Sequence, residues 1–206
     1  MHAIESTSTY QELTIAMAHR GCPVCRLEAR SVARYLDSVF YESVNDVGFR
    51  TELRAAGGLC PAHARTAVDM GDVLGLAILG RDLLRAWAER GSGACPACGV
   101  RSQTMRLAVD TFVEGLGGEA LAAAWKGSDP FCRRHWALVE PRVGSAVGRD
   151  QADKLEKIQR DLDALVVSFD YHHRSEPVSD AARVSWRLVW QLLTGEWLGG
   201  HPTDPL

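Results

Sequence analysis

CPVC at residues 22–25 is followed by CPAH at 60–63, CPAC at 95–98 and CRRH at 132–135. These four short motifs use all six cysteines of the chain and two of its seven histidines. Pairs of cysteine or histidine three residues apart have the spacing of metal ligands on one turn of chain. The motifs therefore predict a metal-binding protein.

The four motifs fall into two copies. Cys22 and Cys95 lie 73 residues apart, and the inserts between the halves of each copy hold 34 and 33 residues. Leu59 precedes Cys60 as Phe131 precedes the cysteine of the last motif. We interpret this pattern as an internal duplication of one structural unit.

Apolar residues recur at intervals of three and four along most of the chain, which is the period of an α-helix. Helices are expected over 9–19, 26–42, a short stretch between Asn45-Asp46 and Gly57-Gly58, 72–89, about 100–113, 120–125, 150–169 and 179–193. On the helix at 72–89, the residues expected to face inward are Leu76, Leu79, Leu83, Leu84 and Trp87. Alternation of β-branched residues with period two is nowhere sustained, so we predict an all-α protein.

The predicted architecture is a pair of helical modules, each closed by a Cys3His metal site, followed by two C-terminal helices. The first metal-binding repeat covers residues 1–91 and the second covers 92–148. The helices of 149–206 are expected to pack on both repeats, with a flexible tail from about residue 198.

The insert within each copy is long enough to leave on one helix and return on another, so that its two ends meet. The favoured pairing therefore joins Cys22 and Cys25 to Cys60 and His63, and Cys95 and Cys98 to Cys132 and His135. A crossed pairing, in which the first CPxC shares a metal with the last CxxH, stays open. We favour pairing within each copy because closing a shorter loop costs less entropy.

Three thiolates and one imidazole form a tetrahedral donor set suited to zinc, so we expect two Zn²⁺ per chain. Because protein atoms fill all four positions, the sites would be structural. An iron–sulfur cluster is the alternative cofactor, since it accepts the same ligand types. Two further hypotheses are a thioredoxin-like redox dithiol, which lacks its usual βαβ context here, and cysteines that are merely buried small apolar residues.

Composition excludes several classes of protein. The net charge of −3 and the pI near 6.2 give no global positive field that would gather nucleic acid or anionic lipid. No apolar run approaches the roughly 20 residues that cross a bilayer, and no secretory signal is visible near the N-terminus. We therefore expect a cytoplasmic protein that binds neither membrane nor nucleic acid.

The sequence contains no GxSxG, P-loop, GxGxxG or Ser/His/Asp array, so no catalytic residue is predicted. We favour an interaction or regulatory module over a redox protein or metalloenzyme, with a protein or a second copy of the chain as partner. Trp186 and Trp190 share one helical face, which indicates either docking of the last helix on the core, the favoured interpretation, or a partner-binding patch formed together with Trp197.

The motifs resemble an uncharacterised bacterial family of helical proteins with paired CPxC and CxxH motifs. The resemblance rests on CPVC at 22–25, GGLCPAH at 57–63, GDVLGLAILGRDLL at 71–84, CPAC at 95–98 and FCRRH at 131–135. It covers most of residues 20–175. It implies a helical metal-binding protein and adds no reaction, because no activity is established for the family.

Overall fold

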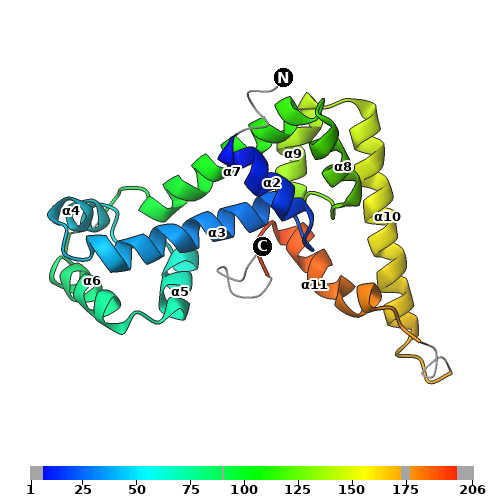
Figure 1. Ribbon diagram of the computed structural model, residues 1–206. Helices are drawn as coiled ribbons and strands as arrows, with labels where there is room; N and C mark the ends of the chain where they lie inside the picture. The colour runs from blue at the N-terminus through cyan, green and yellow to red at the C-terminus, as the bar shows by residue number, and fades with distance from the viewer. Residues whose placement is uncertain (1–6, 90, 173–176, 199–206) are drawn as a thin grey trace. The chain divides into compact units, whose positions relative to one another are not determined.

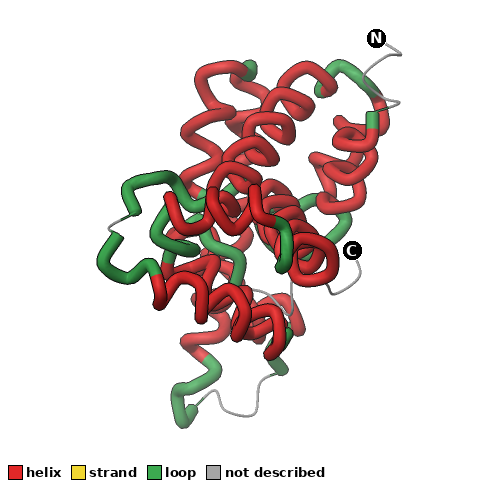
Figure 2. Tube along the Cα trace, turned by 90° about the vertical axis from the view of Figure 1, so that its left-hand side faces the viewer, coloured by secondary structure: helices red, strands yellow, loops and turns green. Residues whose placement is uncertain are grey.

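The computed structural model describes residues 7–89, 91–172 and 177–198. Within these ranges every regular element is a helix, and Figure 2 shows helices joined by loops with no strand. The all-α prediction is therefore confirmed. The tail expected to be flexible from about residue 198 lies, beyond that residue, outside the described part of the chain.

The helices follow one another along the chain from α2 to α11 (Figure 1). In order they are α2 Ser8–Met17, α3 Pro23–Ser38, a π-helical turn Val39–Ser43, α4 Val47–Ala55, α5 Pro61–Met70, α6 Val73–Arg85, α7 Pro96–Gly115, α8 Glu119–Gly127, α9 Arg133–Val139, a 3-10 turn Glu140–Arg142, α10 Ser145–Val167 and α11 Asp180–Thr194. The expected helices are all present with shifted ends. No expected range covers α9 or α5, and only Pro61 at its first position indicates α5.

Side chains at the predicted start signals cap several helices. Asp46 accepts a hydrogen bond from the Phe49 N–H at 2.7 Å and so begins α4. Asp72 accepts one from the Gly75 N–H at 2.6 Å at the start of α6. These carboxylates satisfy N–H groups that have no partner within the helix, which explains why α4 and α6 begin where they do.

The chain divides into two compact units. Unit 1 comprises residues 1–27 with 106–206, and unit 2 comprises residues 28–105. The boundaries fall inside α3 and α7. The repeats expected at 1–91 and 92–148 were defined by the duplicated motifs, whereas the two units are defined by compactness. The repeats therefore stay a prediction.

Unit 1 is built around an aromatic cluster. Phe112 lies edge-on to Trp125 and Phe131, with ring centroids 5.3 and 4.8 Å apart, while Trp125 and Phe131 stack at 4.9 Å. All three rings are fully buried. Around them α2 packs on α8, and α11 packs on α9 and along α10 (Figure 1).

α11 docks through a face other than its tryptophans. Ala182, Leu188 and Leu192 are buried, whereas Trp186 and Trp190 are 49% and 60% exposed. The last helix therefore docks on the core, as favoured, but not through the face that carries Trp186 and Trp190. Leucines at 188 and 192 lie one turn apart on the opposite side and provide the buried stripe.

Unit 2 buries Val32, Leu36, Val39, Leu53 and Leu79, which come from α3, the π-helical turn, α4 and α6. Two residues expected to face inward do not. Leu84 is 68% exposed and Trp87 is 81% exposed. α6 ends at Arg85, so Trp87 follows the helix, and Leu84 lies beside the stripe formed by Leu76, Leu79 and Leu83.

No helix in the described part of the chain combines the length and the apolar character needed to cross a bilayer.

Candidate metal centres

The eight predicted ligands form two Cys3His clusters. One cluster lies in unit 1 and contains Cys22, Cys25, Cys132 and His135. The other lies in unit 2 and contains Cys60, His63, Cys95 and Cys98. In each cluster the four ligand atoms lie within 4.8 Å of one another, and all six cysteines are free thiols. We call these clusters site 1 and site 2.

The favoured pairing of ligands within each copy is therefore wrong, and the crossed pairing is the one observed. The chain leaves Cys25 on α3, which rises about 24 Å over its 16 residues. It returns on α4, which has only 9 residues, rises about 14 Å and ends before the Gly57-Gly58 turn. The returning helix is thus about 10 Å shorter than the outgoing one.

Loop entropy does favour closure within each copy, but the difference in free energy is too small to decide the pairing. Cys25 and Cys132 are 107 residues apart. Replacing a 34-residue loop by one of this length costs about 1 kcal/mol more, because loop entropy grows only with the logarithm of length. Burying a single large apolar side chain offsets that difference.

Every half-site lies at the beginning of a helix. The first residue of each motif immediately precedes the helix, as Cys60 precedes α5 and Cys132 precedes α9. The second ligand follows three residues later, so both side chains lie on one face of the first turn. Each site therefore receives two helix N-termini, α3 with α9 or α5 with α7, and their positive dipole ends stabilise thiolates.

The distances between ligand atoms match a tetrahedron around one ion. In site 1, Nδ1 of His135 lies 3.3, 3.5 and 3.2 Å from the sulfurs of Cys22, Cys25 and Cys132, and the last two sulfurs are 3.6 Å apart. With zinc bond lengths, a tetrahedron has edges of about 3.8 Å between sulfurs and about 3.6 Å between sulfur and nitrogen. The residues present therefore fit a zinc ion.

Site 2 repeats this geometry with the same nitrogen of its histidine. Nδ1 of His63 lies 3.2, 3.5 and 3.5 Å from the sulfurs of Cys60, Cys95 and Cys98. The sulfurs of Cys60 and Cys98 are 3.7 Å apart. Each site thus directs three sulfurs and one Nδ1 toward its own centre.

The sites differ in exposure to solvent. In site 1 no ligand is more than 1% exposed. In site 2, His63 and Cys95 are nearly buried, whereas Cys60 and Cys98 are half-buried. Reagents in solution therefore reach site 2 more readily than site 1.

Hydrogen bonds among the thiols of site 1 divide their proton affinities. Donation by the Cys22 and Cys25 thiols holds the pKa of Cys132 well below its usual range, even though burial opposes this. The hydrogen bond that Cys25 donates to Cys132 raises the pKa of Cys25, and burial raises it further. The Cys132 sulfur also accepts a hydrogen bond from the backbone N–H of His135 at 3.5 Å.

Site 2 shows the same division of proton affinity. Burial raises the pKa of Cys98 to about 12, and its hydrogen bond to Cys60 adds to the effect. Burial also opposes ionisation of Cys60, but hydrogen bonds from the His63 N–H and from the two neighbouring thiols more than offset it and lower its pKa. A divalent cation would take the place of the shared protons and favour all three thiolates.

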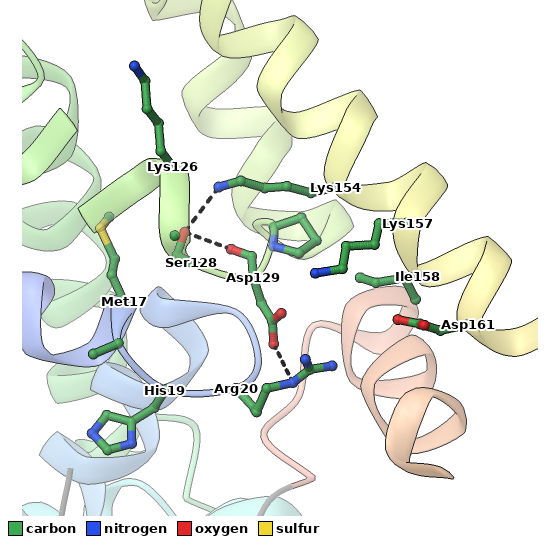
Figure 3. Close-up of a pocket in the computed structure, with 13 residues that line it drawn as sticks. Met17, His19, Arg20, Lys126, Ser128, Asp129, Lys154, Lys157, Ile158 and Asp161 are labelled. Atoms are coloured by element: carbon green, nitrogen blue, oxygen red, sulfur yellow. Dashed lines mark hydrogen bonds and ion pairs between the residues drawn. The ribbon is translucent and has the colours of Figure 1, made fainter. Parts of the chain in front are cut away.

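Two polar side chains that the motifs do not reveal hold the halves of site 1 together. Asp129, three residues before Cys132, accepts a hydrogen bond from the Gly21 N–H at 2.6 Å and pairs with Arg20 at 3.1 Å (Figure 3). Asp129 thereby ties the chain entering one half-site to the chain entering the other.

Gln151 of α10 makes the second brace. It accepts a hydrogen bond from the Phe131 N–H at 3.0 Å and donates one to the Phe131 carbonyl at 2.9 Å. Both backbone groups lie next to Cys132 in a buried setting, where pairing is obligatory. Gln151 is distant from the motifs in the sequence, and Asp129 lies just outside one of them. Helical periodicity therefore indicated neither residue.

The segment before Cys132 also borders a polar cavity of about 200 Å³ in unit 1 (Figure 3). Lys154 lies along its wall, donates a hydrogen bond to Ser128 Oγ at 3.1 Å and contacts the Trp125 carbonyl at the end of α8. Burial lowers the pKa of Lys154 to about 8, against the opposing charges of Asp150 and Asp129. The contact with a helix C-terminus gives Lys154 a structural role.

Comparison with known proteins gives one relative. The chain is 47% identical over 194 residues to an uncharacterised 23.9 kDa protein in the xynA 3′ region of Caldicellulosiruptor sp. (strain Rt8B.4), covering 84% of this chain and 95% of the relative. The chain belongs to the family of that protein. The resemblance to an uncharacterised family is thus confirmed, and the two Cys3His clusters agree with it. No family model and no solved structure matches the chain.

Proposed function

We propose that the protein binds one structural Zn²⁺ at each Cys3His site and that the two zinc-pinned helical units act as an interaction or regulatory module. The observation that carries the proposal is the set of sulfur–nitrogen and sulfur–sulfur distances, 3.2–3.7 Å, which suits a single tetrahedral ion in both sites. Four protein ligands leave no position for water or substrate, so a structural role follows.

The same distances argue for zinc over an iron–sulfur cluster. A cluster with several irons takes its protein ligands on different irons and so spreads them apart. Here all four ligand atoms of each site lie within 4.8 Å of one another. The proposal therefore assigns one ion, and not a cluster, to each site.

The charge of each site also suits a structural ion. Three thiolates and Zn²⁺ leave a net charge of −1, which two helix N-termini and the nearby N–H donors stabilise. Free thiols at all six cysteines are compatible with the reducing cytoplasm, and a cytoplasmic location is part of the proposal.

An interaction role is supported by the outer face of α11. Trp186, Trp190 and Leu193 are each about half exposed or more, and they recur at intervals of four and three residues. Aromatic residues on one exposed helical stripe are typical of surfaces that contact another protein. The proposed partner is a protein or a second copy of this chain, and no nucleic acid is expected.

The second candidate is an iron–sulfur or open-site metal protein with a redox role. The half-buried Cys60 and Cys98 favour it for site 2, because an exposed ligand can be displaced by an incoming molecule.

Metal analysis of protein purified without added metal tests the proposal. Colourless protein with two zinc ions per chain supports it. Brown protein with iron and acid-labile sulfide refutes it in favour of the second candidate. Protein that holds neither metal and keeps the same helical circular dichroism after chelation refutes both.

A further inference from the structure

Unit 2 contains an apolar cavity that is separate from the metal ligands. It has a volume of about 230 Å³ and lies among the π-helical turn, α4, α5 and α6. Every residue lining it is apolar or glycine, including Val39, Phe49, Leu53, Ala67 and Leu79. It therefore offers a guest dispersion contacts and burial, and no hydrogen bond from a side chain.

The cavity opens to solvent on one side, with the 62% exposed Val68 on its rim. An apolar cavity of about 150 Å³ admits benzene. By proportion, the cavity in unit 2 has room for about eight or nine carbon atoms.

The walls of the cavity are built so that they do not collapse. Asp82 of α6 accepts hydrogen bonds from Arg50 at 2.9 and 2.6 Å and from Arg54 at 3.1 Å, which fixes α4 against α6. Gly57 and Gly58 then end α4 with φ of 73° and 104°, a conformation that glycine adopts without strain. The apolar cavity is thus preformed.

A positively charged surface adjoins the cavity. Gly80 lines both the cavity and a shallow depression on the outer side of α6, whose other residues include Arg81 and Arg85. Both arginines are exposed, and neither forms an ion pair with a carboxylate within the described ranges. The depression and the cavity therefore adjoin at Gly80, where an added Cβ would have no neighbouring atom within 4 Å.

We infer that unit 2 binds a small amphiphilic carboxylate, with an alkyl chain of about eight carbons in the apolar cavity and the carboxylate beside Arg81 and Arg85. The tail supplies burial and the head supplies charge complementarity, which is the usual division in a ligand pocket. No metal ligand lines the cavity, so this inference does not depend on the proposed zinc sites.

Calorimetric titration of the purified full chain with octanoate tests the inference, with 1-octanol and butyrate as comparison ligands. Octanoate is expected to bind saturably at one site, and butyrate, whose chain is too short to fill the cavity, at least about tenfold more weakly. The inference is overturned if octanoate binding does not saturate or if butyrate binds equally well.

A blocking variant locates the site. Gly80→Leu places a side chain where the depression and the cavity adjoin and should weaken octanoate binding at least about tenfold, while removing a glycine from a helix favours folding. Gly148→Leu on α10 is the matched control, because a Cβ there also meets nothing within 4 Å and the position lies in unit 1. Val68→Trp, at a 62% exposed position on the rim, is a second blocking variant. Equal octanoate binding by the wild type and both blocking variants would exclude the cavity as the site.

The head group is tested separately. Arg81→Glu should weaken octanoate binding by about two- to fivefold, the range of an exposed ion pair, and leave 1-octanol binding unchanged. Arg65→Glu, on the exposed side of α5 and outside both the cavity and the depression, serves as the charge-matched control. If Arg81→Glu and Arg65→Glu lower octanoate affinity equally, the proposed place of the carboxylate is wrong.

Discussion

The pairing of the ligands predicts how many metal ions two double variants retain. Cys22→Ser combined with Cys132→Ser alters only site 1, so site 2 should still bind one ion. Cys22→Ser combined with Cys60→Ser alters both sites and should abolish tight binding. Pairing within each sequence copy would reverse these two results.

The expected loss per ligand follows from the closed geometry of the sites. Structural zinc sites bind with about 10–16 kcal/mol, so one ligand in four accounts for about 3 kcal/mol. A loss of that size weakens the altered site by about 100-fold. In site 1 the effect should be at the upper end, since ligands no more than 1% exposed leave no room for water to replace a lost sulfur.

Competition with a chromophoric chelator, followed by cobalt titration, measures both the count and the affinity. Tetrahedral cobalt–thiolate absorption reports each site that is still complete. Circular dichroism of each variant, recorded with and without zinc, shows whether the unaltered unit remains folded. Retention of one tight ion by the Cys22/Cys60 double variant, together with none in the Cys22/Cys132 double variant, would refute the crossed pairing.

Three further predictions concern backbone strain, pH and reactivity. Gly21→Ala should lower the free energy of unfolding in urea more than Gly71→Ala does. Both glycines have positive φ, +97° and +78°, so either substitution costs about 1–2 kcal/mol of backbone strain. Only at Gly21 does the new Cβ also lie 2.7 Å from Gln191 Oε1. Equal losses would show that Gln191 moves aside freely. The hydrogen bond from Arg50 holds the pKa of Asp82 below 3.8; burial opposes this effect, and the charges of Arg50, Arg54 and Arg85 add to it. Folded protein therefore binds fewer protons than unfolded protein as the pH falls below about 4, so stability should drop there. Asp82→Asn should flatten this decline. An unaltered decline in that variant would assign the acid sensitivity to other carboxylates. Finally, chelators should strip the half-buried site 2 before site 1, so that maleimide labels Cys60 and Cys98 first, as peptide mass mapping can record. Simultaneous labelling of all six cysteines would contradict this order.

The eight Cys and His side chains of the two clusters and their local geometry were predictable, because both depend only on residues close together in the sequence. Each cysteine or histidine pair lies three residues apart at a helix start, and a proline after Cys22, Cys60 and Cys95 begins the helix. Helical periodicity likewise predicted the all-α fold and most helix positions. It misjudged Leu84, because a wide apolar stripe does not tell which edge of it the neighbouring helices cover, and Trp87, because α6 ends at Arg85 before reaching it.

The sequence by itself determined which eight side chains can bind a metal and that each pair lies on one helical turn. Only the tertiary structure decided which pairs meet. Loop entropy separates the two pairings by about 1 kcal/mol, so the outcome depended on tertiary contacts such as the buried rings of Phe112, Trp125 and Phe131 and the braces made by Asp129 and Gln151. These contacts join residues far apart in the chain, and no local pattern encodes their sum.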